Sequence, residues 1–431
     1  MEKSIVQIPF SVGRRWLFYR RSQRFSRERL ARWQNEQLIR LVRHAGTHVP
    51  YYRQLFAAAG LNLTTFRGAP DMHKIPLLDK ETVRTRSSEL LSEQAARYGI
   101  TWDSTSGSTG TPLHFALSNR IQANKIAALL RSFGWAGYRP GMRTLSVQSY
   151  YFAHADYEHN RLYNVVRFDS NRLKREAALQ LAAYLQKHPV RFIIGFPFDI
   201  LMIGRFAAEA GRAIPAPRGI ITYGEALSEH RQQQLGKLYG CNVYDFHSMH
   251  EGSAMIATCE HGTRHLVSDF CFPEVLNDAG EPAREGWLVG TSYYNYTMPL
   301  IRYHTRDLVK LADGVCDCGR PFPAVEQIHG KACDHIVTPD GRILGAVMSH
   351  SVDAAQGVVV SQCVQDAPDH VTFRLVTDAQ FTAASQEALE RGLRKRLGSA
   401  MKIDFAIVDE LEKTPGGKTP FIRSTIGNQF Q

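Results

Sequence analysis

The chain of 431 residues has few cysteines and no long apolar segment, and each shortage excludes a class of protein. No window approaches the roughly 18 uninterrupted apolar residues of a membrane-spanning helix, so the sequence predicts no membrane span. The first residues, MEKSIVQIPFSVGRRW, lack an apolar core followed by a small-residue cleavage site, and we therefore expect a cytoplasmic protein. In that compartment the seven cysteines indicate reduced thiols or a metal site and not a disulfide framework.

Acidic residues are also scarce: 41 Asp and Glu against 52 Lys and Arg give a formal charge of +11. The excess is concentrated in the first 32 residues, where arginines are interleaved with aromatic residues. Such a segment could bind nucleic acid, an anionic membrane surface or an acidic carrier protein. A solvated arginine face on a helix is the commoner explanation, and without an accompanying motif no nucleic-acid partner is expected. The arginines are Arg14, Arg15, Arg20, Arg21, Arg24, Arg27, Arg29 and Arg32.

The order of the predicted elements indicates an α/β fold. The chain exceeds the about 250 to 300 residues at which a single core stops growing, so at least two domains are expected. Helical periodicity predicts helices over 28–45, 120–134, 172–187, 198–210 and 228–239. Short apolar runs alternate with them at 143–147, 190–194, 219–222 and 242–246. This alternation is typical of a doubly wound parallel sheet, whereas the sequence over 286–311 predicts a small antiparallel sheet or barrel.

The last hundred residues predict a separate, smaller α+β unit. HIVTPDGRIL (335–344) contains Pro-Asp-Gly, which marks a tight hairpin. Strands over 357–364, 371–376 and 402–408 and a helix over 385–397 follow. We therefore predict a large N-terminal domain over 1–329, with doubly wound sheets, a small β-rich subdomain and a helical region over 1–100. A hinge at 330–334 would join it to a small mobile C-terminal domain over 335–431.

Residues 104–112, STSGSTGTP, predict a loop that holds phosphate. Hydroxyl side chains alternate with glycines, which allow positive φ and close approach of the backbone, as in an anion-binding nest. The stretch is not a Walker A loop, because GxxxxGK[ST] does not fit. A solvated Ser/Gly linker is the alternative. The candidate phosphate-binding residues are Thr105, Ser106, Gly107, Ser108, Thr109 and Gly110.

Further polar groups follow two predicted strands. YGEAL (223–227) ends one strand and DFHSMHE (245–251) ends the next, and in an open parallel sheet such carboxyl ends border the ligand crevice. RYHTRD, which ends at Asp307, and the glycine-flanked Lys418 come later in the chain. Taken one at a time, Glu225 and Glu251 could be solvated loop carboxylates, Asp307 a turn or cap residue, and Lys418 the exposed tip of a turn. As an ordered set they are far more specific.

This set resembles the adenylate-forming enzymes, in particular the branch of phenylacetate–CoA ligases and capsular-polysaccharide adenylating proteins. The resemblance covers nearly the whole chain. It includes LVRHAGTHVPYYRQLF (41–56), KIPLLDK (74–80), YNYTMPLIRYHTRDL (294–308) and CDCGR (316–320). It implies an AMP-forming carboxylate ligase, in which ATP and a carboxylate give an acyl-adenylate and pyrophosphate before a nucleophile displaces AMP.

The resemblance assigns a role to each group at the phosphate end. The loop 105–110 would wrap the β- and γ-phosphates of ATP. Glu251 would hold Mg²⁺, a hard cation that prefers oxygen ligands, and the preceding His250 could donate to a phosphate or carboxylate. Lys418 would reach the carboxylate and the α-phosphate, where its charge stabilises the transition state of attack.

The resemblance also places the nucleoside. Asp307 would accept hydrogen bonds from both ribose hydroxyls, a task suited to a two-oxygen anion. The adenine would lie against residues of the two strand ends, and His247 could contact a polar acid. The residues of this set are Gly224, Glu225, Ala226, Asp245, Phe246 and His247.

Two departures from the family pattern concern the loop and the hinge. Thr111 stands where the family has a lysine. The hinge reads Gly330-Lys331-Ala332-Cys333-Asp334, so Lys331 replaces an arginine and loses its bidentate fork. Because the family pivots on this hinge between half reactions, the departure bears more on thioester formation than on adenylation.

A zinc site is a second hypothesis. Cys259 and His265 in CEHGTRH, with Cys316 and Cys318 in CDC, offer three sulfurs and one imidazole for a closed tetrahedral, structural site. His261 is the alternative imidazole. The alternative is that the four residues do not form a site and that the cysteines simply pack in a core.

The sequence says least about the identity of the substrate. Aromatic residues at 150–152 and 196–198 favour an aromatic carboxylic acid, although core packing explains them almost as well. The acceptor stays open between coenzyme A and an amine, a hydroxyl or a carrier protein. A nucleotide- and zinc-binding protein without catalysis is a third hypothesis, against which Lys418 and Glu251 argue. A homodimer is compatible with the sequence.

Overall fold

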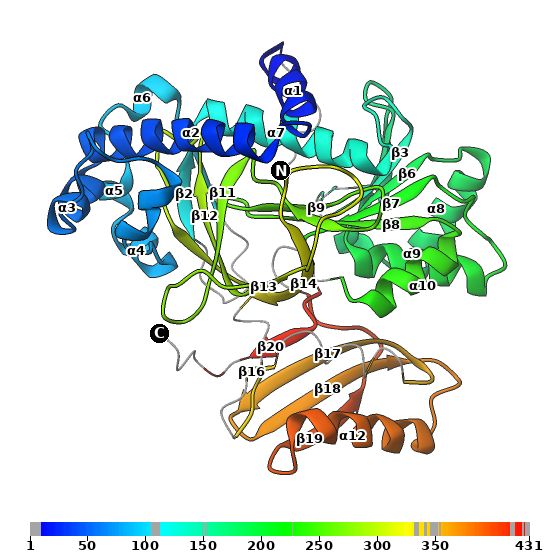
Figure 1. The fold of residues 1–431 in the computed structure, drawn as a ribbon. Helices are drawn as coiled ribbons and strands as arrows, with labels where there is room; N and C mark the ends of the chain where they lie inside the picture. Colours follow the sequence, from blue (N-terminus) through cyan, green and yellow to red (C-terminus); the bar gives the residue numbers. More distant parts are fainter. Residues whose placement is uncertain are drawn as a thin grey trace. The chain divides into compact units, whose positions relative to one another are not determined.

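The computed structural model describes residues 10–104, 113–148, 150, 152, 154–225, 227–331, 336–339, 343–344, 352, 355–413, 419–424 and 426 (Figure 1). The chain divides into two compact units. Unit 1 comprises Met1–Pro140 and Phe246–Ile328, and unit 2 comprises Gly141–Asp245 and His329–Gln431. The predicted hinge at 330–334 falls largely outside the described residues and stays a prediction.

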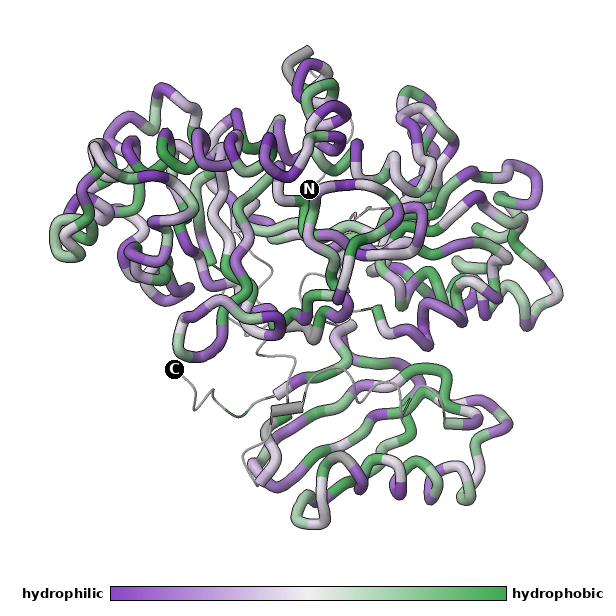
Figure 2. The backbone as a smooth tube through the Cα atoms, in the orientation of Figure 1, coloured by the Kyte–Doolittle hydropathy of each residue, from purple (hydrophilic) through white to green (hydrophobic). Residues whose placement is uncertain are grey.

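The first part of unit 1 is helical, as the sequence predicts. In α2 (Arg27–His48) the buried side chains Leu38, Leu41, Val42 and Ala45 recur at helical spacing, and the Ser26 hydroxyl caps the first turn by accepting from the Arg29 amide. Figure 2 shows hydrophilic and hydrophobic residues alternating along this helix. The other helices are α1 (Phe10–Ser22), α3 (Pro50–Ala58), η1 (Ala69–Lys74), α4 (Lys80–Thr85), α5 (Ser87–Leu90), α6 (Ala95–Tyr98), α7 (Asn119–Phe133) and η2 (Gly134–Ala136).

The sheet of unit 1 has the strand order β11-β12-β13-β14-β10-β9-β8. β12 and β13 pair antiparallel, which confirms the antiparallel sheet predicted over 286–311. Gly290 of β12 lies so close to the Ser253 carbonyl that an added Cβ would be 2.1 Å from its oxygen, so only glycine fits there. The strands are β8 (Asn242–Ser248), β9 (Met255–Thr258), β10 (Arg264–Leu266), β11 (Cys271–Leu276), β12 (Glu285–Ser292), β13 (Tyr303–Leu311) and β14 (Ala324–Lys331).

A two-stranded hairpin precedes α7. β1 (Thr101–Ser104) and β2 (His114–Leu117) pair antiparallel, with Ser104 opposite His114. The hydroxyl and glycine loop therefore connects two paired strands, a feature that the sequence did not predict. Residues 105–112 of the loop lie outside the described residues.

Unit 2 contains the parallel sheet that the sequence predicts. Its strand order is β7-β6-β3-β5-β4, and the pairs β3–β5, β3–β6 and β6–β7 are parallel. β4 pairs antiparallel with β5, and neither of these two strands was predicted. The elements are β3 (Thr144–Gln148), β4 (Tyr157–Asn160), β5 (Val165–Asp169), η3 (Ser170–Arg172), α8 (Arg175–Lys187), β6 (Phe192–Gly195), α9 (Pro197–Glu209), β7 (Gly219–Tyr223) and α10 (Glu229–Tyr239).

The C-terminal part of unit 2 is the predicted α+β module. A four-stranded sheet of order β19-β18-β17-β20 packs its apolar residues against α12, whose first turn is fixed by a capping box between Thr382 and Ser385. β15 and β16 pair antiparallel with Ile336 opposite Leu344, as the Pro-Asp-Gly hairpin predicts. The elements are β15 (Ile336–Val337), β16 (Ile343–Leu344), β17 (Val358–Ala367), β18 (His370–Thr377), α12 (Ala383–Leu397), β19 (Lys402–Ile407) and β20 (Ile422–Ser424).

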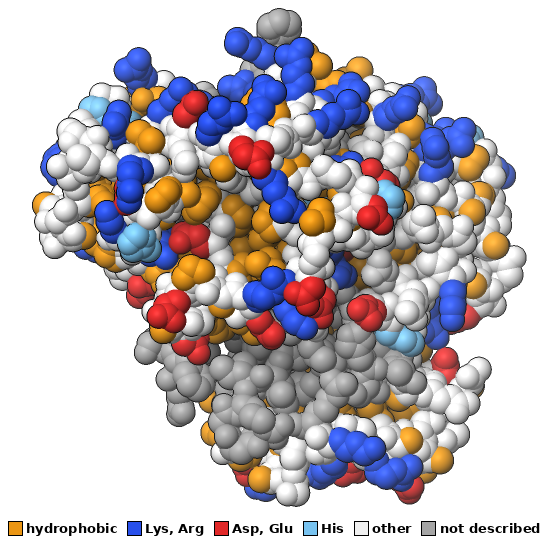
Figure 3. All heavy atoms as spheres, viewed as in Figure 1, with side chains coloured by type: hydrophobic (Ala, Val, Ile, Leu, Met, Phe, Trp, Pro, Cys, Tyr) orange, Lys and Arg blue, Asp and Glu red, His pale blue; other side chains and the backbone are white. Residues whose placement is uncertain are grey.

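The arginine-rich N-terminus forms an amphipathic surface. Tyr19 is fully buried and its hydroxyl donates to Asn124 of α7, whereas Arg14, Arg20 and Arg21 are exposed. Figure 3 shows Lys and Arg side chains along the edge formed by α1 and α2. Among the described residues, no helix is both long and apolar enough to cross a bilayer.

A buried ion pair fixes α1 and α7 to the sheet of unit 1. The guanidinium of Arg131 donates two hydrogen bonds to the Asp269 carboxylate, at 2.9 and 3.1 Å, and both side chains are at most 1% exposed. The Ser22 hydroxyl at the end of α1 donates to the same carboxylate at 2.5 Å. Three elements thus depend on one desolvated anion.

Asp269→Asn is expected to lower the free energy of unfolding by about 3 to 5 kcal/mol, because it leaves the Arg131 guanidinium buried without its counter-ion. Urea unfolding followed by circular dichroism measures the change. Glu93→Gln is the matched control, since it removes one partner of the exposed Arg53–Glu93 pair and should leave the midpoint nearly unchanged. Equal midpoints for the two variants would contradict this assignment.

Candidate active site

Charged side chains from β1, α7 and the segment after β8 meet in unit 1. Nε2 of His250 lies 2.7 Å from an Asp103 carboxylate oxygen. Nζ of Lys125 donates to the His250 carbonyl at 2.8 Å and lies 3.5 Å from the His250 Nδ1 atom. Glu251, the next residue, is 1% exposed. The cluster joins the strand before the hydroxyl and glycine loop to the carboxylate expected to hold magnesium.

Burial decides the protonation of this cluster. Burial, together with the nearby Lys125 charge, lowers the pKa of His250 to about 4, so the imidazole is neutral near pH 7. A neutral ring that donates from Nε2 to Asp103 presents the Nδ1 lone pair to the Lys125 ammonium, which agrees with both distances. Burial also lowers the pKa of Lys125 to about 8, while Glu251 and Asp103 act to raise it.

Asp307 lies on the buried face of β13, where alternate residues point inward. Its side chain is fully buried, and one carboxylate oxygen is 2.9 Å from Nε2 of His247 on β8. The Asp307 amide donates to the Thr305 hydroxyl at 3.1 Å. Arg306, just before Asp307, has a φ of 65°, a left-handed conformation that is uncommon outside glycine. An irregular stretch of β13 and the contact with His247 therefore orient the Asp307 carboxylate.

A buried carboxylate, Asp199, and a half-buried one, Glu225, lie in unit 2. Glu225 follows Gly224, whose φ is +85°, and accepts from the Thr419 amide at 2.6 Å. Lys413 donates to an Asp199 carboxylate oxygen at 3.2 Å and to the Ser170 carbonyl at 2.9 Å. Burial raises the pKa of Glu225 to about 7, and the Asp199 charge adds to the increase. These contacts connect segments that are far apart in the sequence within one unit.

The remaining predicted nucleotide residues are placed as follows. The Asp245 carboxylate accepts from the Thr222 hydroxyl at 3.1 Å. Phe246 is 4% exposed, and its ring packs edge to face against Phe133 with 5.2 Å between centroids. Lys331 is the last residue of β14. The predicted residues Thr105 to Gly110, Ala226 and Lys418 lie outside the described residues.

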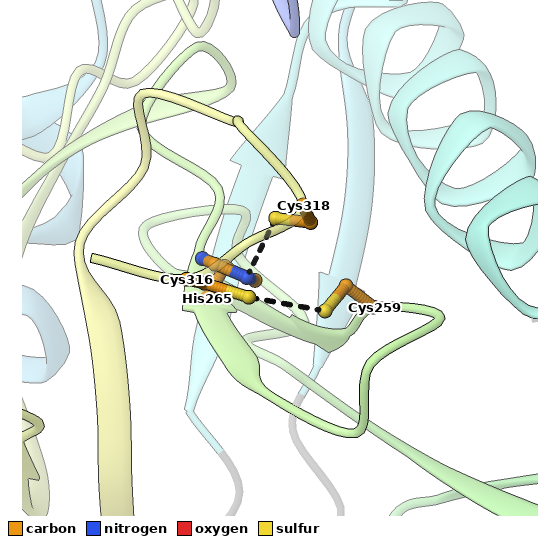
Figure 4. A group of neighbouring side chains, drawn as sticks. All are labelled: Cys259, His265, Cys316 and Cys318. Carbon is orange, nitrogen blue, oxygen red and sulfur yellow. Dashed lines mark hydrogen bonds between the residues drawn. The ribbon is translucent and has the colours of Figure 1, made fainter.

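Four predicted zinc ligands come together in unit 1 (Figure 4). The ligand atoms of Cys259, His265, Cys316 and Cys318 all lie within 4.8 Å of one another. The Cys259 and Cys316 sulfurs are 3.7 Å apart, and the Cys318 sulfur is 3.4 Å from Nε2 of His265. A sulfur separation of roughly 3.7 to 3.8 Å is the edge of a tetrahedron with Zn–S near 2.3 Å, whereas a disulfide needs about 2.05 Å. These residues fit a tetrahedral metal ion.

The environment of His265 leaves its Nε2 atom available as a metal ligand. Its Nδ1 lies 3.2 Å from the Phe322 carbonyl, which fixes the proton there and leaves the Nε2 lone pair facing the sulfurs. Burial lowers the pKa of His265, which favours the neutral ring. His265 thus lies in the group of four, and the alternative imidazole of His261 does not belong to it.

Several site residues were missed from the sequence. Asp103 stands just before the hydroxyl and glycine loop, a position that could have drawn attention to it. Lys125 is one cation in an amphipathic helix, and Asp199 and Lys413 are 214 residues apart. No sequence pattern marks such residues, because their partners come from distant elements.

The chain has relatives over nearly its whole length. Residues 336–425 match the family model of the CapK C-terminal domain. The phenylacetate-coenzyme A ligase of Thermus thermophilus is 25% identical over 91% of this chain and 94% of its own length. Protein CapK of Staphylococcus aureus is 21% identical over 91% of this chain and 89% of its own. A crystal structure of 2-hydroxyisobutyryl-CoA ligase in the postadenylation state superposes with a TM-score of 0.75 at 18% identity, covering 94% of this chain and 91% of that one.

The fold and these relatives define a protein of the adenylate-forming ligase class, and the chain is an AMP-forming ligase. Residues 336–425 carry a CapK C-terminal domain, and the chain as a whole is similar to phenylacetate-coenzyme A ligases and to CapK. The resemblance drawn from the sequence is thereby confirmed, and the roles of individual residues stay predictions.

Glu225 is expected to make stability depend on pH. Its pKa is raised to about 7 in the folded state, so between about pH 4.3 and pH 7 the unfolded chain loses this proton while the folded chain keeps it. The Glu225 contribution is therefore fully present below the unfolded pKa and is lost as pH rises toward 7. Urea unfolding of the wild type and of Glu225→Gln at several pH values measures it. The wild type should lose stability relative to the variant across this range, and parallel curves would contradict the assignment.

Proposed function

We propose that the chain activates a carboxylic acid with ATP and transfers the acyl group to coenzyme A. The acid and ATP give an acyl-adenylate and pyrophosphate, and the coenzyme A thiol then displaces AMP. The contact between His250 and Asp103 carries the proposal. It holds the start of the hydroxyl and glycine loop, which is suited to phosphate, beside Glu251, which is suited to magnesium.

The phosphate end of the reaction would be served by unit 1. Glu251 offers a buried carboxylate, the hard oxygen ligand that Mg²⁺ prefers, and the ion when bound would neutralise phosphate charge. The neutral His250 ring keeps Asp103 in place without adding charge. Asp307 would accept from the ribose hydroxyls, with His247 holding one of its oxygens at a fixed angle. Lys418, a residue of unit 2 outside the described part of the chain, is the cation we propose for the α-phosphate.

An aromatic acid is the substrate class we favour. Tyr150 and Phe152 of unit 2 stack with 5.2 Å between ring centroids and an interplanar angle of 4°. The Asp169 carboxylate accepts from the backbone amides of both residues, at 3.1 and 2.9 Å. A stacked pair anchored in this way offers a flat wall for a planar acid.

Transfer to an amine, a hydroxyl or a carrier protein is the second candidate function. The observation that favours it is Lys331 at the end of β14, where the family's hinge has an arginine. Lysine keeps the charge and loses the planar fork, which bears on the step that follows adenylation.

We also propose that Cys259, His265, Cys316 and Cys318 hold a structural zinc ion. The four ligands would fill a tetrahedral coordination sphere and leave no position for substrate, so the ion would stabilise the fold and take no part in the chemistry. It would join the segment after β9, β10 and the segment between β13 and β14.

Pyrophosphate release measured against a panel of acids, with and without coenzyme A, tests the proposed function. We expect release that depends on an aromatic acid, and AMP turnover that rises when coenzyme A is added. Lys418→Ala should slow pyrophosphate release roughly hundredfold to thousandfold and leave ATP binding nearly intact. Turnover that ignores coenzyme A would favour the second candidate, and the absence of acid-dependent release with every acid would refute adenylation.

Protein purified without chelator is expected to contain about one zinc ion per chain. Cys318→Ser should lose most of the zinc and lower the thermal unfolding midpoint, because metal binding contributes to folding. Elemental analysis and thermal unfolding measure both effects. Cys241→Ser, a cysteine outside the cluster, is the matched control and should keep its zinc. Less than about a tenth of an equivalent in the wild type would refute the site.

A further inference from the structure

We propose that Lys125 is a catalytic residue of the adenylation step. Its ammonium group contacts the β- and γ-phosphates of ATP and stabilises pyrophosphate as it leaves. In this step a carboxylate oxygen forms a bond to the α-phosphorus while the bond from that phosphorus to the bridging oxygen breaks, and the electron pair goes to pyrophosphate. Lys125 transfers no proton and acts by its charge. The inference rests on the proposed use of ATP.

The position of Lys125 is the first support. Its Nζ atom is 2.8 Å from the carbonyl oxygen of His250, the residue directly before Glu251. The same histidine is hydrogen-bonded to Asp103, the residue directly before the hydroxyl and glycine loop of residues 104–112. The ammonium group therefore lies among the groups that would hold the phosphates and the magnesium ion.

The loop itself is the second support. Residues 104–112, STSGSTGTP, contain no lysine and no arginine. Hydroxyl and amide donors can cradle phosphate oxygens, but they carry no net charge to offset the negative charge that builds on pyrophosphate. A cation from another element would offset that charge, and α7 offers Lys125, which contacts His250, the partner of Asp103 near the loop end of the hairpin.

The bonding of Lys125 is the third support. Within the described part of the chain, its hydrogen bonds go to the His250 carbonyl oxygen and toward the His250 ring nitrogen, and it forms no ion pair within 4.0 Å. An ammonium group has three donors, so these partners leave one to spare. A lysine with a purely structural role would be expected to pair directly with a carboxylate, as Lys74 does with the buried Asp71 at 2.8 Å. The side chain is only half-buried and so remains within reach of a ligand.

Nucleotides that differ in their phosphates separate a catalytic role from a structural one. Lys125→Met keeps the length and removes the charge, Lys125→Arg restores the charge, and Lys74→Met is the matched control elsewhere in unit 1. ATP and AMP binding are measured by calorimetry. Inhibition by pyrophosphate and the KM for ATP are measured in acid-dependent ATP–pyrophosphate exchange.

For Lys125→Met we expect ATP binding, the KM for ATP and pyrophosphate inhibition to weaken roughly tenfold to hundredfold, the usual loss for a hydrogen bond to a charged group. AMP binding should change less than about twofold, because AMP lacks the β- and γ-phosphates. Lys125→Arg should recover part of the loss, and Lys74→Met should match the wild type. Equal weakening of ATP and AMP binding, or unchanged pyrophosphate inhibition, would overturn the inference.

The binding measurement keeps this inference apart from the proposed function. If wild-type protein shows no acid-dependent pyrophosphate release but loses its preference for ATP over AMP in Lys125→Met, adenylation is refuted and the phosphate contact of Lys125 stands. If wild-type protein releases pyrophosphate and Lys125→Met behaves like Lys74→Met, adenylation stands and the role of Lys125 is refuted.

Discussion

The hydrogen bond between His250 and Asp103 is the constraint on which the candidate site depends. It joins the strand before the hydroxyl and glycine loop to the segment that carries Glu251, two pieces of chain 147 residues apart. Burial keeps the histidine neutral, so the bond adds no charge to a region that already holds two carboxylates and one ammonium group.

Buried charged groups connect distant segments of the chain at several places in the described structure. Asp269 gathers α1 and α7, Asp307 is held by His247, and Lys413 reaches Asp199 in the other half of unit 2. Each such group is costly to bury alone and becomes acceptable only when its partner is in place. This coupling makes the arrangement of the site cooperative, since the loss of one partner leaves a charge uncompensated.

The regular elements were well predicted from the sequence, because local periodicity reports which face of a helix or strand is buried. The helices α7 to α10, the parallel strands β3, β6 and β7, and the C-terminal α+β module follow from such patterns. The hairpin β1–β2 and the edge strand β4 did not, since short half-exposed strands carry little alternation. Among the site residues, those in named motifs, such as Glu251 and Asp307, were proposed from the sequence, whereas Asp103 and Lys125 were not.

The sequence by itself indicated the class of the protein and three cysteines suited to zinc, because the order of motifs and the chemistry of the ligands can be read along the chain. It determined neither which imidazole joins the three cysteines nor which lysine lies beside His250. Those choices belong to the tertiary structure, which brings His265 within 3.4 Å of the Cys318 sulfur and Lys125 within 2.8 Å of the His250 carbonyl. The physical reason is that coordination and charge pairing act over a few ångströms in space, and only the packing of strands and helices turns distance along the chain into such contacts.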